Sequence, residues 1–292
     1  IREAETGIIF DDYVTRQGEI VTGTVQRISN ETIFVNLGRT EGILSANEQV
    51  PGERYKVNDR LKVFIMDVKK TTKGPQVFLS RSHPGLVKRL FELEVPEIED
   101  GTVEIKGIAR EAGSRTKMAV YTQFEDVDPV GACVGTRGTR VQAIVDELHG
   151  EKIDIITWSE NPEELIASVL SPAKVEEVIV DESGEKSATV IVPDYQLSLA
   201  IGKEGQNVRL AAKVSGWKID IKSHSQYKAA EEEYGDEGFV EYDEDAEAEI
   251  SEAEMDVEAE TSEALEEAET SEAPEEAAEA AADEASEEQE AE

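Results

Sequence analysis

Two short segments framed by glycines carry the binding chemistry of this sequence. Gly135-Thr136-Arg137-Gly138 and Gly202-Lys203-Glu204-Gly205 each hold a basic residue between two glycines. Paired glycines let a backbone approach a sugar-phosphate chain closely, the basic residue adds positive charge, and the amides of a following helix face the phosphates. The pattern therefore predicts two sites that bind single-stranded RNA.

The similarity between the two segments extends beyond the glycines. Residues 133–141 correspond to residues 200–208, and the segment Lys-Ile-Asp-Ile at 152–155 is repeated at 218–221. One Gly-x-x-Gly alone is more often an ordinary turn, but two in the same frame indicate a duplicated domain. The residues predicted to contact RNA are Gly135, Arg137, Gly138 and Arg140 in the first copy, and Gly202, Lys203, Gly205, Asn207 and Arg209 in the second. The alternative for the two helix arginines is a solvated helix face.

The elements that must position these loops follow from the hydrophobic periodicity. A short helix at 129–134 precedes the first loop, and a helix at 139–148 and a strand at 152–158 follow it. A helix near 86–91 and strands at 102–110 and 117–121 complete the first copy. The second copy repeats the order with segments at 162–170, 173–181, 186–192, 195–201, 206–214 and 218–222. Both copies resemble α+β KH domains of the prokaryotic type, with helices on one face of a three-stranded sheet.

Residues 18–82 have a different pattern of secondary structure. Five short strands are predicted there, at 19–28, 32–37, 40–44, 61–68 and 76–80. Five strands in so short a segment predict a small closed barrel of the OB type. Alternation points Ile33, Val35 and Leu37 inward and leaves Phe34 outside. Phe34 is therefore a candidate for stacking on RNA bases, and the alternative is a ring covered by a neighbouring part of the chain.

The charge is concentrated at one end of the chain. The 292 residues carry a net charge of −37, but residues 229–292 hold 30 of the 66 acidic residues and no Lys or Arg. This composition cannot bury enough apolar surface to order the chain, so we expect a disordered acidic tail over 227–292. The tail either improves solubility or mimics RNA and competes for the basic surfaces.

Several classes of function are excluded by what the sequence lacks. The single cysteine, Cys133, rules out a disulfide framework, and His83, His149 and His224 lie in separate regions. We therefore expect no catalytic site, no metal site and no cofactor. No apolar run approaches the ~18 residues that a membrane span needs, so we expect a cytoplasmic protein. We also expect a monomer. The start at Ile1, within helix-like sequence, leads us to expect a further segment upstream.

Four segments together resemble one family. Residues 23–27, 79–87, 128–135 and 196–203 are similar to the NusA family of bacterial transcription elongation, termination and antitermination factors, and the resemblance covers about residues 1–225. It implies a linker or helix end at 1–17, an S1 domain at 18–82 and KH domains at 83–159 and 160–226. It also implies binding of nascent RNA at RNA polymerase, with other elongation and antitermination factors as partners. We expect the polymerase-binding amino-terminal domain of the family to lie outside this sequence.

Three residues depart from the family pattern. Glu31 and Ser45 stand where S1 domains often carry an aromatic residue and a histidine, and Glu204 stands where a second basic residue is common. A carboxylate repels phosphate, so the second loop is expected to hold RNA less tightly. Two alternatives remain, namely an RNA-binding module of an RNA-processing or RNA-chaperone assembly, and a scaffold that binds proteins.

Overall fold

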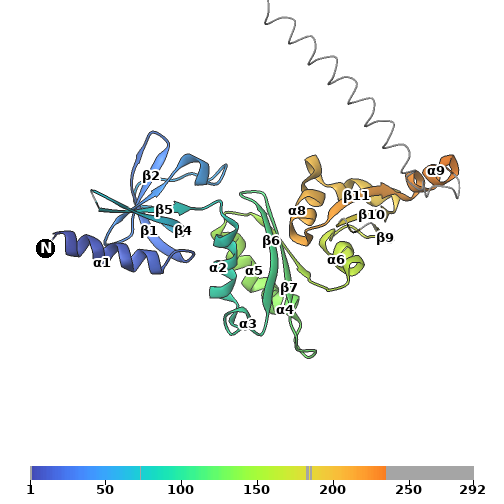
Figure 1. Ribbon diagram of the computed structural model, residues 1–292, viewed down its shortest axis with the longest axis horizontal. Coiled ribbons are helices and arrows are strands. Elements are labelled where there is room, and N and C mark those ends of the chain that lie inside the picture. Colours follow the sequence, from blue (N-terminus) through green and yellow to red (C-terminus); the bar gives the residue numbers. More distant parts are fainter. Residues whose placement is uncertain (1, 73, 182–183, 185, 235–292) are drawn as a thin grey trace, which may run out of the picture. The chain divides into compact units, whose positions relative to one another are not determined.

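The computed structural model describes residues 2–72, 74–181, 184 and 186–234, and it begins with a helix that packs on a closed barrel (Figure 1). Helix α1 (Arg2–Thr15) is followed by five strands in the barrel order β1-β2-β3-β5-β4. The strands are β1 (Ile20–Ser29), β2 (Thr32–Asn36), β3 (Glu41–Leu44), β4 (Arg60–Thr71) and β5 (Gly74–Ser80). The predicted barrel is therefore confirmed.

Alternation of apolar residues explains the barrel interior. Val25, Val35 and Val77 are fully buried, and each points inward from a different strand. Helix α1 adds Tyr13, which is 2% exposed and whose hydroxyl donates a hydrogen bond of 3.0 Å to the carbonyl of Leu37. The segment that precedes the barrel is thus a helix that contributes to the barrel core.

The two copies of the repeat fold alike. The first KH unit contains α2 (Pro84–Glu94), α3 (Pro96–Glu99), β6 (Glu104–Glu111), β7 (Arg115–Tyr121), α4 (Pro129–Val134), α5 (Thr139–Glu147) and β8 (Lys152–Thr157). The second contains α6 (Pro162–Val169), β9 (Glu177–Val180), β10 (Ser187–Val192), α7 (Leu197–Ile201), α8 (Gln206–Ser215) and β11 (Lys218–Ser223). The sheet orders are β6-β7-β8 and β9-β10-β11, and in each sheet the last two strands are parallel. Strands β8 and β11 are thus edge strands in equivalent places.

Several predicted boundaries differ from the structure, and two of these differences are the largest. Strand β9 begins at Glu177 rather than at residue 173, because the amide of Ala173 donates to the carbonyl of Leu170 and prolongs the turn after α6. Helix α9 (His224–Tyr234) occupies the start of the segment 227–292 that was predicted to be a disordered tail. Residues 235–292 of that tail lie outside the described residues.

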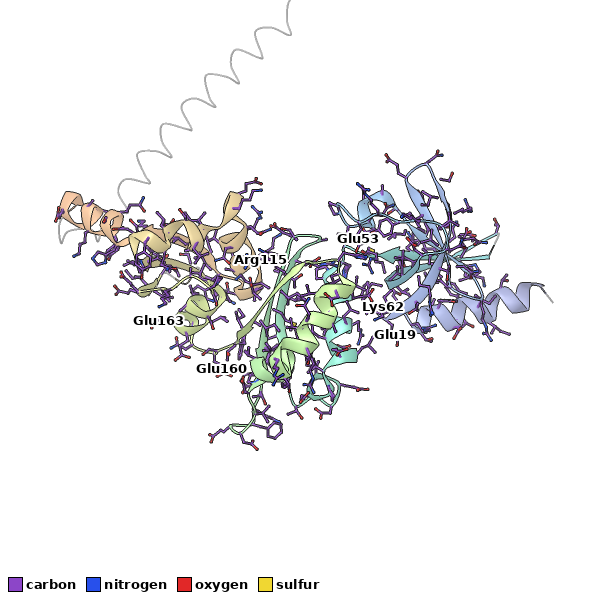
Figure 2. The ribbon with its side chains drawn as sticks, turned by 180° about the vertical axis from the view of Figure 1, so that it is seen from behind. Glu19, Glu53, Lys62, Arg115, Glu160 and Glu163 are labelled. Carbon is purple, nitrogen blue, oxygen red and sulfur yellow. The ribbon has the colours of Figure 1, made fainter. Side chains whose placement is uncertain are left out.

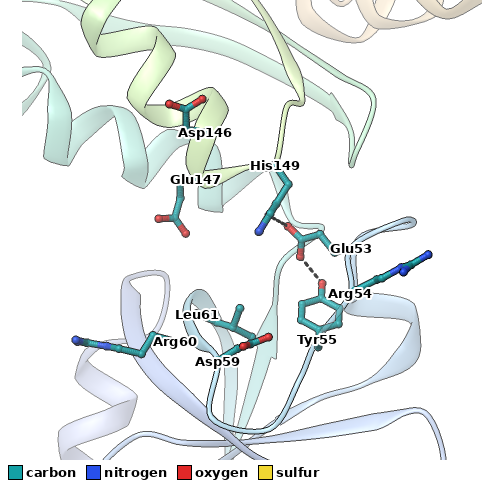
Figure 3. A pocket seen from close by; sticks show the side chains of 9 residues that line it. All are labelled: Glu53, Arg54, Tyr55, Asp59, Arg60, Leu61, Asp146, Glu147 and His149. Carbon is teal, nitrogen blue, oxygen red and sulfur yellow. Dashed lines mark hydrogen bonds and ion pairs between the residues drawn. The ribbon is translucent and has the colours of Figure 1, made fainter.

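The barrel and the first KH unit are joined by a buried ionic network. Arg81, which directly follows β5, is fully buried and forms an ion pair with Glu53 of the barrel. Its guanidinium also donates to the carbonyl oxygens of Lys62 and Glu147, at 2.8 and 3.2 Å. Figure 3 shows the other partners of Glu53, which are the hydroxyl of Tyr55 and the ring of His149.

Candidate nucleic-acid interface

The first glycine of each loop has a backbone conformation that other residues rarely adopt. Gly135 has φ 74° and ψ 172°, and Gly202 has φ 76° and ψ 171°. A Cβ atom on Gly135 would lie 2.7 Å from Cγ of Arg140, and one on Gly202 would lie 2.8 Å from the backbone nitrogen of Asn207. Both glycines are therefore required by conformation and by close packing against the following helix.

The third residue of each loop is left-handed although it is not glycine. Arg137 has φ 57° and ψ 25°, and Glu204 has φ 53° and ψ 28°. This conformation costs about 1–2 kcal/mol for an L-residue. Two loops of different sequence thus carry the same strain, which is typical of functional sites.

The equivalent backbones also fix which residues correspond. Arg137 matches Glu204, and Lys203 matches Thr136, so the two basic residues occupy different loop positions. The second loop therefore presents a carboxylate at the position where the first presents a guanidinium.

The basic residues of the loops are exposed and available. Within the described part of the chain, the side chains of Arg137 and Lys203 form no hydrogen bond and no ion pair. Helices α5 and α8 follow directly, and their N-cap residues, Gly138 and Gly205, offer no side-chain cap. The amides of Thr139 and Gln206, the first residues of these helices, donate to the carbonyls of Thr136 and Lys203. The next amides of a first helical turn have no intrahelical partner, so both loops present backbone donors beside a positive side chain.

Two predicted contact residues, Arg140 and Asn207, turn inward instead. The Arg140 guanidinium donates to the carbonyl of Ala132 at 2.6 Å and to Glu97 at 2.9 Å. The Asn207 amide, only 3% exposed, donates to the carbonyls of Leu170 and Ala200, each at 3.0 Å. Both side chains tie the helix after the loop to the end of the helix before it. Their contact with RNA stays a prediction, and for Asn207 it would require a buried amide to move.

Arg209 connects the second loop to the first KH unit. Its Nε donates to Glu111 of β6 at 2.6 Å, and its Nη1 donates to the carbonyl of Glu204 at 3.1 Å. Gln206 donates to the same carboxylate at 2.8 Å. The hydrogen bond from Arg209 holds the pKa of Glu111 below its ordinary value. Sequence reasoning missed Glu111 because it belongs to the other copy of the repeat.

A cavity of about 350 Å³ lies beside the second loop. Arg115, labelled in Figure 2, and Lys152 line it from the first KH unit, and Lys203 lines it from the second. Arg115 forms an ion pair with Asp154 at 2.7 Å. The side chain of Lys152 is exposed and forms no ion pair with another described residue. Asn207 also lines the cavity, and its Oδ1 is buried with no hydrogen-bond partner among the described residues. The cavity thus adds positive charge to the second loop.

A second, shallower groove of about 600 Å³ follows the edge strand β8. Val130 of α4 and Ile155 of β8 line it with apolar side chains, and Glu164 and Lys174 line it with charged ones. An apolar floor beside an edge strand is what the KH mode of binding requires for the bases.

The outward aromatic residue of the barrel is covered by a cation. Phe34 is half-buried, and the guanidinium of Arg27 lies 3.4 Å from the centre of its ring. Arg27 also forms an ion pair with Glu41 at 2.9 Å. Glu31 and Ser45 have no ring, so neither position supplies the stacking surface that S1 domains often carry there.

Residues 2–72, 74–181, 184 and 186–234 contain no group of three or more His, Cys, Asp and Glu placed to hold a metal ion. No helix among them has the length and apolar character to cross a membrane. Burial raises the pKa of Cys133 to about 12, so its thiol is a poor nucleophile.

Comparison with known proteins identifies all three folded parts. A model of the S1 RNA binding domain matches residues 15–80. Models of the NusA-like first and second KH domains match residues 81–158 and 162–229.

Several bacterial proteins named transcription termination/antitermination protein NusA are similar to this chain. The protein of Bacillus subtilis is 63% identical over 225 residues, which cover 77% of this chain and 60% of that protein. The protein of Halalkalibacterium halodurans is 62% identical over 226 residues, with coverages of 77% and 59%. The protein of Mycobacterium tuberculosis is 48% identical over 229 residues, with coverages of 76% and 66%. The chain thus spans less than two thirds of the length of these relatives. With one S1 domain and two NusA-like KH domains, the chain belongs to the NusA family.

Proposed function

We propose that this chain binds nascent single-stranded RNA at a transcribing RNA polymerase and so modulates pausing, termination and antitermination. The observation that carries the proposal is the pair of loops with the same strained backbone, each with an exposed basic side chain that pairs with no other described residue. The names of the similar proteins support the transcriptional role.

The RNA backbone would lie along the two loops. Phosphates would contact Arg137 and Lys203 together with amides of the first turn of α5 and α8 that lack an intrahelical partner. The bases would lie over the groove beside β8 in the first KH domain, with about four nucleotides held by each KH domain. Arg209, held by Glu111, would orient the second loop rather than bind phosphate with its full charge.

The names of the similar proteins support a wider proposal. RNA polymerase and other elongation and antitermination factors are the proposed protein partners, and the proposed location is the cytoplasm. The chain would act as a monomer and as a binding protein without catalysis. The similar proteins named for termination and antitermination motivate these proposals.

Loop substitutions test the RNA-binding role. Thr136-Arg137 and Lys203-Glu204 are each replaced by Asp-Asp, separately and together, and binding of a fluorescent single-stranded RNA is measured by anisotropy. We expect each change to weaken binding, the combination to abolish it, and the wild-type affinity to fall steeply between about 50 and 200 mM salt.

A matched control separates the loops from overall charge. Lys88 on α2 is exposed, and Lys88→Asp changes the net charge as much as the second loop variant does. It should leave the affinity nearly unchanged. Circular dichroism confirms that each variant is folded. Undiminished binding by the folded double-loop variant would overturn the proposal.

A further inference from the structure

A row of paired residues crosses the outer face of the barrel. In the strand register, Arg27 of β1 faces Phe34 of β2, Phe34 faces Ile43 of β3, and Ile43 faces Phe78 of β5. Residues that face one another across adjacent strands lie on the same side of a sheet. Phe34, Ile43 and Phe78 therefore form one continuous strip, which we call the outer strip.

The outer strip does not belong to the protein interior. Its three residues are half-buried and are part of none of the three core clusters. Their neighbours along the strands point the other way, and Val35 and Val77 are fully buried. Burial in the barrel core thus does not explain why two aromatic side chains stand on this face.

Each ring of the outer strip carries a cation. The guanidinium of Arg27 lies 3.4 Å from the centre of the Phe34 ring, and Nζ of Lys69 lies 5.1 Å from that of Phe78. Each cation also has a carboxylate partner, Glu41 for Arg27 and Asp67 for Lys69, at 2.9 and 3.5 Å. Exposed ion pairs of this kind contribute little, so both cations can exchange their carboxylate for a phosphate.

We propose that Phe34 and Phe78 are two stacking platforms for the bases of one single-stranded RNA segment. Arg27 and Lys69 leave the rings when RNA binds and contact the flanking phosphates. The rings stand roughly 10 Å apart, since two strand spacings separate β2 from β5. Stacking on aromatic rings tolerates any base, because every base has a π-face.

This inference rests on the proposed RNA-binding function and adds a subsite to it. Phe34 alone was a sequence candidate, and the positions where a second ring was expected hold Glu31 and Ser45. Phe78 supplies the second ring from β5 instead. The barrel would therefore bind RNA in spite of its departures from the usual S1 pattern.

Substitution of Phe78 tests the second platform directly. Phe78→Leu keeps an apolar side chain of similar size but removes the π-face. We expect the Kd for a single-stranded RNA long enough to reach both the barrel and the KH domains to rise about tenfold. Phe78→Trp should retain the affinity, and bound RNA should quench its indole fluorescence beyond the background of Trp158 and Trp217. Phe34→Leu should weaken binding as Phe78→Leu does.

A gain of affinity excludes misfolding as the explanation. Glu41→Gln and Asp67→Asn remove the carboxylates that hold Arg27 and Lys69. Each change removes one negative charge near the bound strand and frees a cation, so we expect affinity to rise about two- to fivefold at about 0.1 M salt.

The outcomes distinguish this inference from the proposed function. Unchanged affinity in folded Phe34→Leu and Phe78→Leu, while the loop substitutions still weaken binding, would overturn the stacking platforms alone. A loss with Phe34→Leu but not with Phe78→Leu would refute the second platform. Absence of any RNA binding by the wild-type chain would refute both proposals.

Discussion

Removal of Arg81 should destabilise the junction between the barrel and the first KH domain. The guanidinium is fully buried, and the carboxylate of its partner Glu53 is 3% exposed. Nε donates to that carboxylate at 2.9 Å, and the other nitrogens donate to the carbonyls of Lys62 and Glu147. Arg81→Met keeps the apolar stem and removes all of these donors.

The size of the effect follows from the charge that stays behind. Glu53 would remain buried without its main partner, and breaking a buried ion pair in this way costs about 3–5 kcal/mol. For a folded part of this size, each kcal/mol lowers Tm by roughly 2–4 °C, so we expect a fall of roughly 6–20 °C. The Tm is measured by circular dichroism, and the free energy of unfolding by urea titration.

A double variant tests the cause. The double variant Glu53→Gln, Arg81→Met has no unpaired buried carboxylate. It should therefore be more stable than Arg81→Met alone. Arg81→Lys keeps the charge but not the planar fork that reaches two partners, and it should fall between wild type and Arg81→Met.

The pH dependence gives an independent check. Burial raises the pKa of Glu53, but the hydrogen bonds and charge of Arg81 outweigh burial and hold that pKa below 4.5. A carboxyl with a lowered folded pKa stabilises the protein above pH 4.5, and this contribution is lost as the pH falls through the folded pKa. Without Arg81, burial should raise the pKa of Glu53. The difference in free energy of unfolding between wild type and Arg81→Met should therefore narrow on acidification. A difference that widens on acidification, or one below about 1 kcal/mol at pH 7, would refute the reasoning.

Three further predictions concern the loops. Gly135→Ala and Gly202→Ala should each cost about 2–4 kcal/mol, because they combine a forbidden conformation with a clash, whereas Gly138→Ala and Gly205→Ala should cost about 1 kcal/mol; equal Tm losses at all four would contradict this. Asn207→Ala should cost about 2–3 kcal/mol by urea titration, because it removes the side-chain donor to the buried carbonyl of Ala200 and one of the two donors to that of Leu170, and a neutral result would show that the amide does not hold the helices. Glu204→Lys should raise RNA affinity about fivefold at about 0.1 M salt, the gain for one added phosphate contact, and an unchanged salt slope would count against a phosphate at that position.

Local patterns were sufficient for most of the fold. Period-two alternation around Ile33 and Val35 predicted β2, and Pro129 at the start of α4 marked a helix start that the structure keeps. The glycine loops could be found because their conformation requires glycine at fixed spacing.

Contacts between distant segments could not be predicted in this way. Glu147 is 66 residues from Arg81 in sequence, and Glu111 is 98 residues from Arg209. Such pairs leave no periodic signal in the sequence. A basic residue that pairs with a distant carboxylate therefore cannot be distinguished from an exposed basic residue until the fold is known. Phe78 was missed for a related reason, since its place beside Phe34 depends on the parallel pairing of β3 with β5.

A titration of the backbone amides tests the central claim most directly. Isotope-labelled protein is titrated with a single-stranded oligoribonucleotide at low salt, and amide signals are followed by NMR. We predict that the amides of residues 135–140 and 202–207 shift together and saturate, because both loops present their backbone donors to the phosphates. If RNA binds while the amides of both loops stay unmoved, the account of the loops as the RNA-binding site is contradicted.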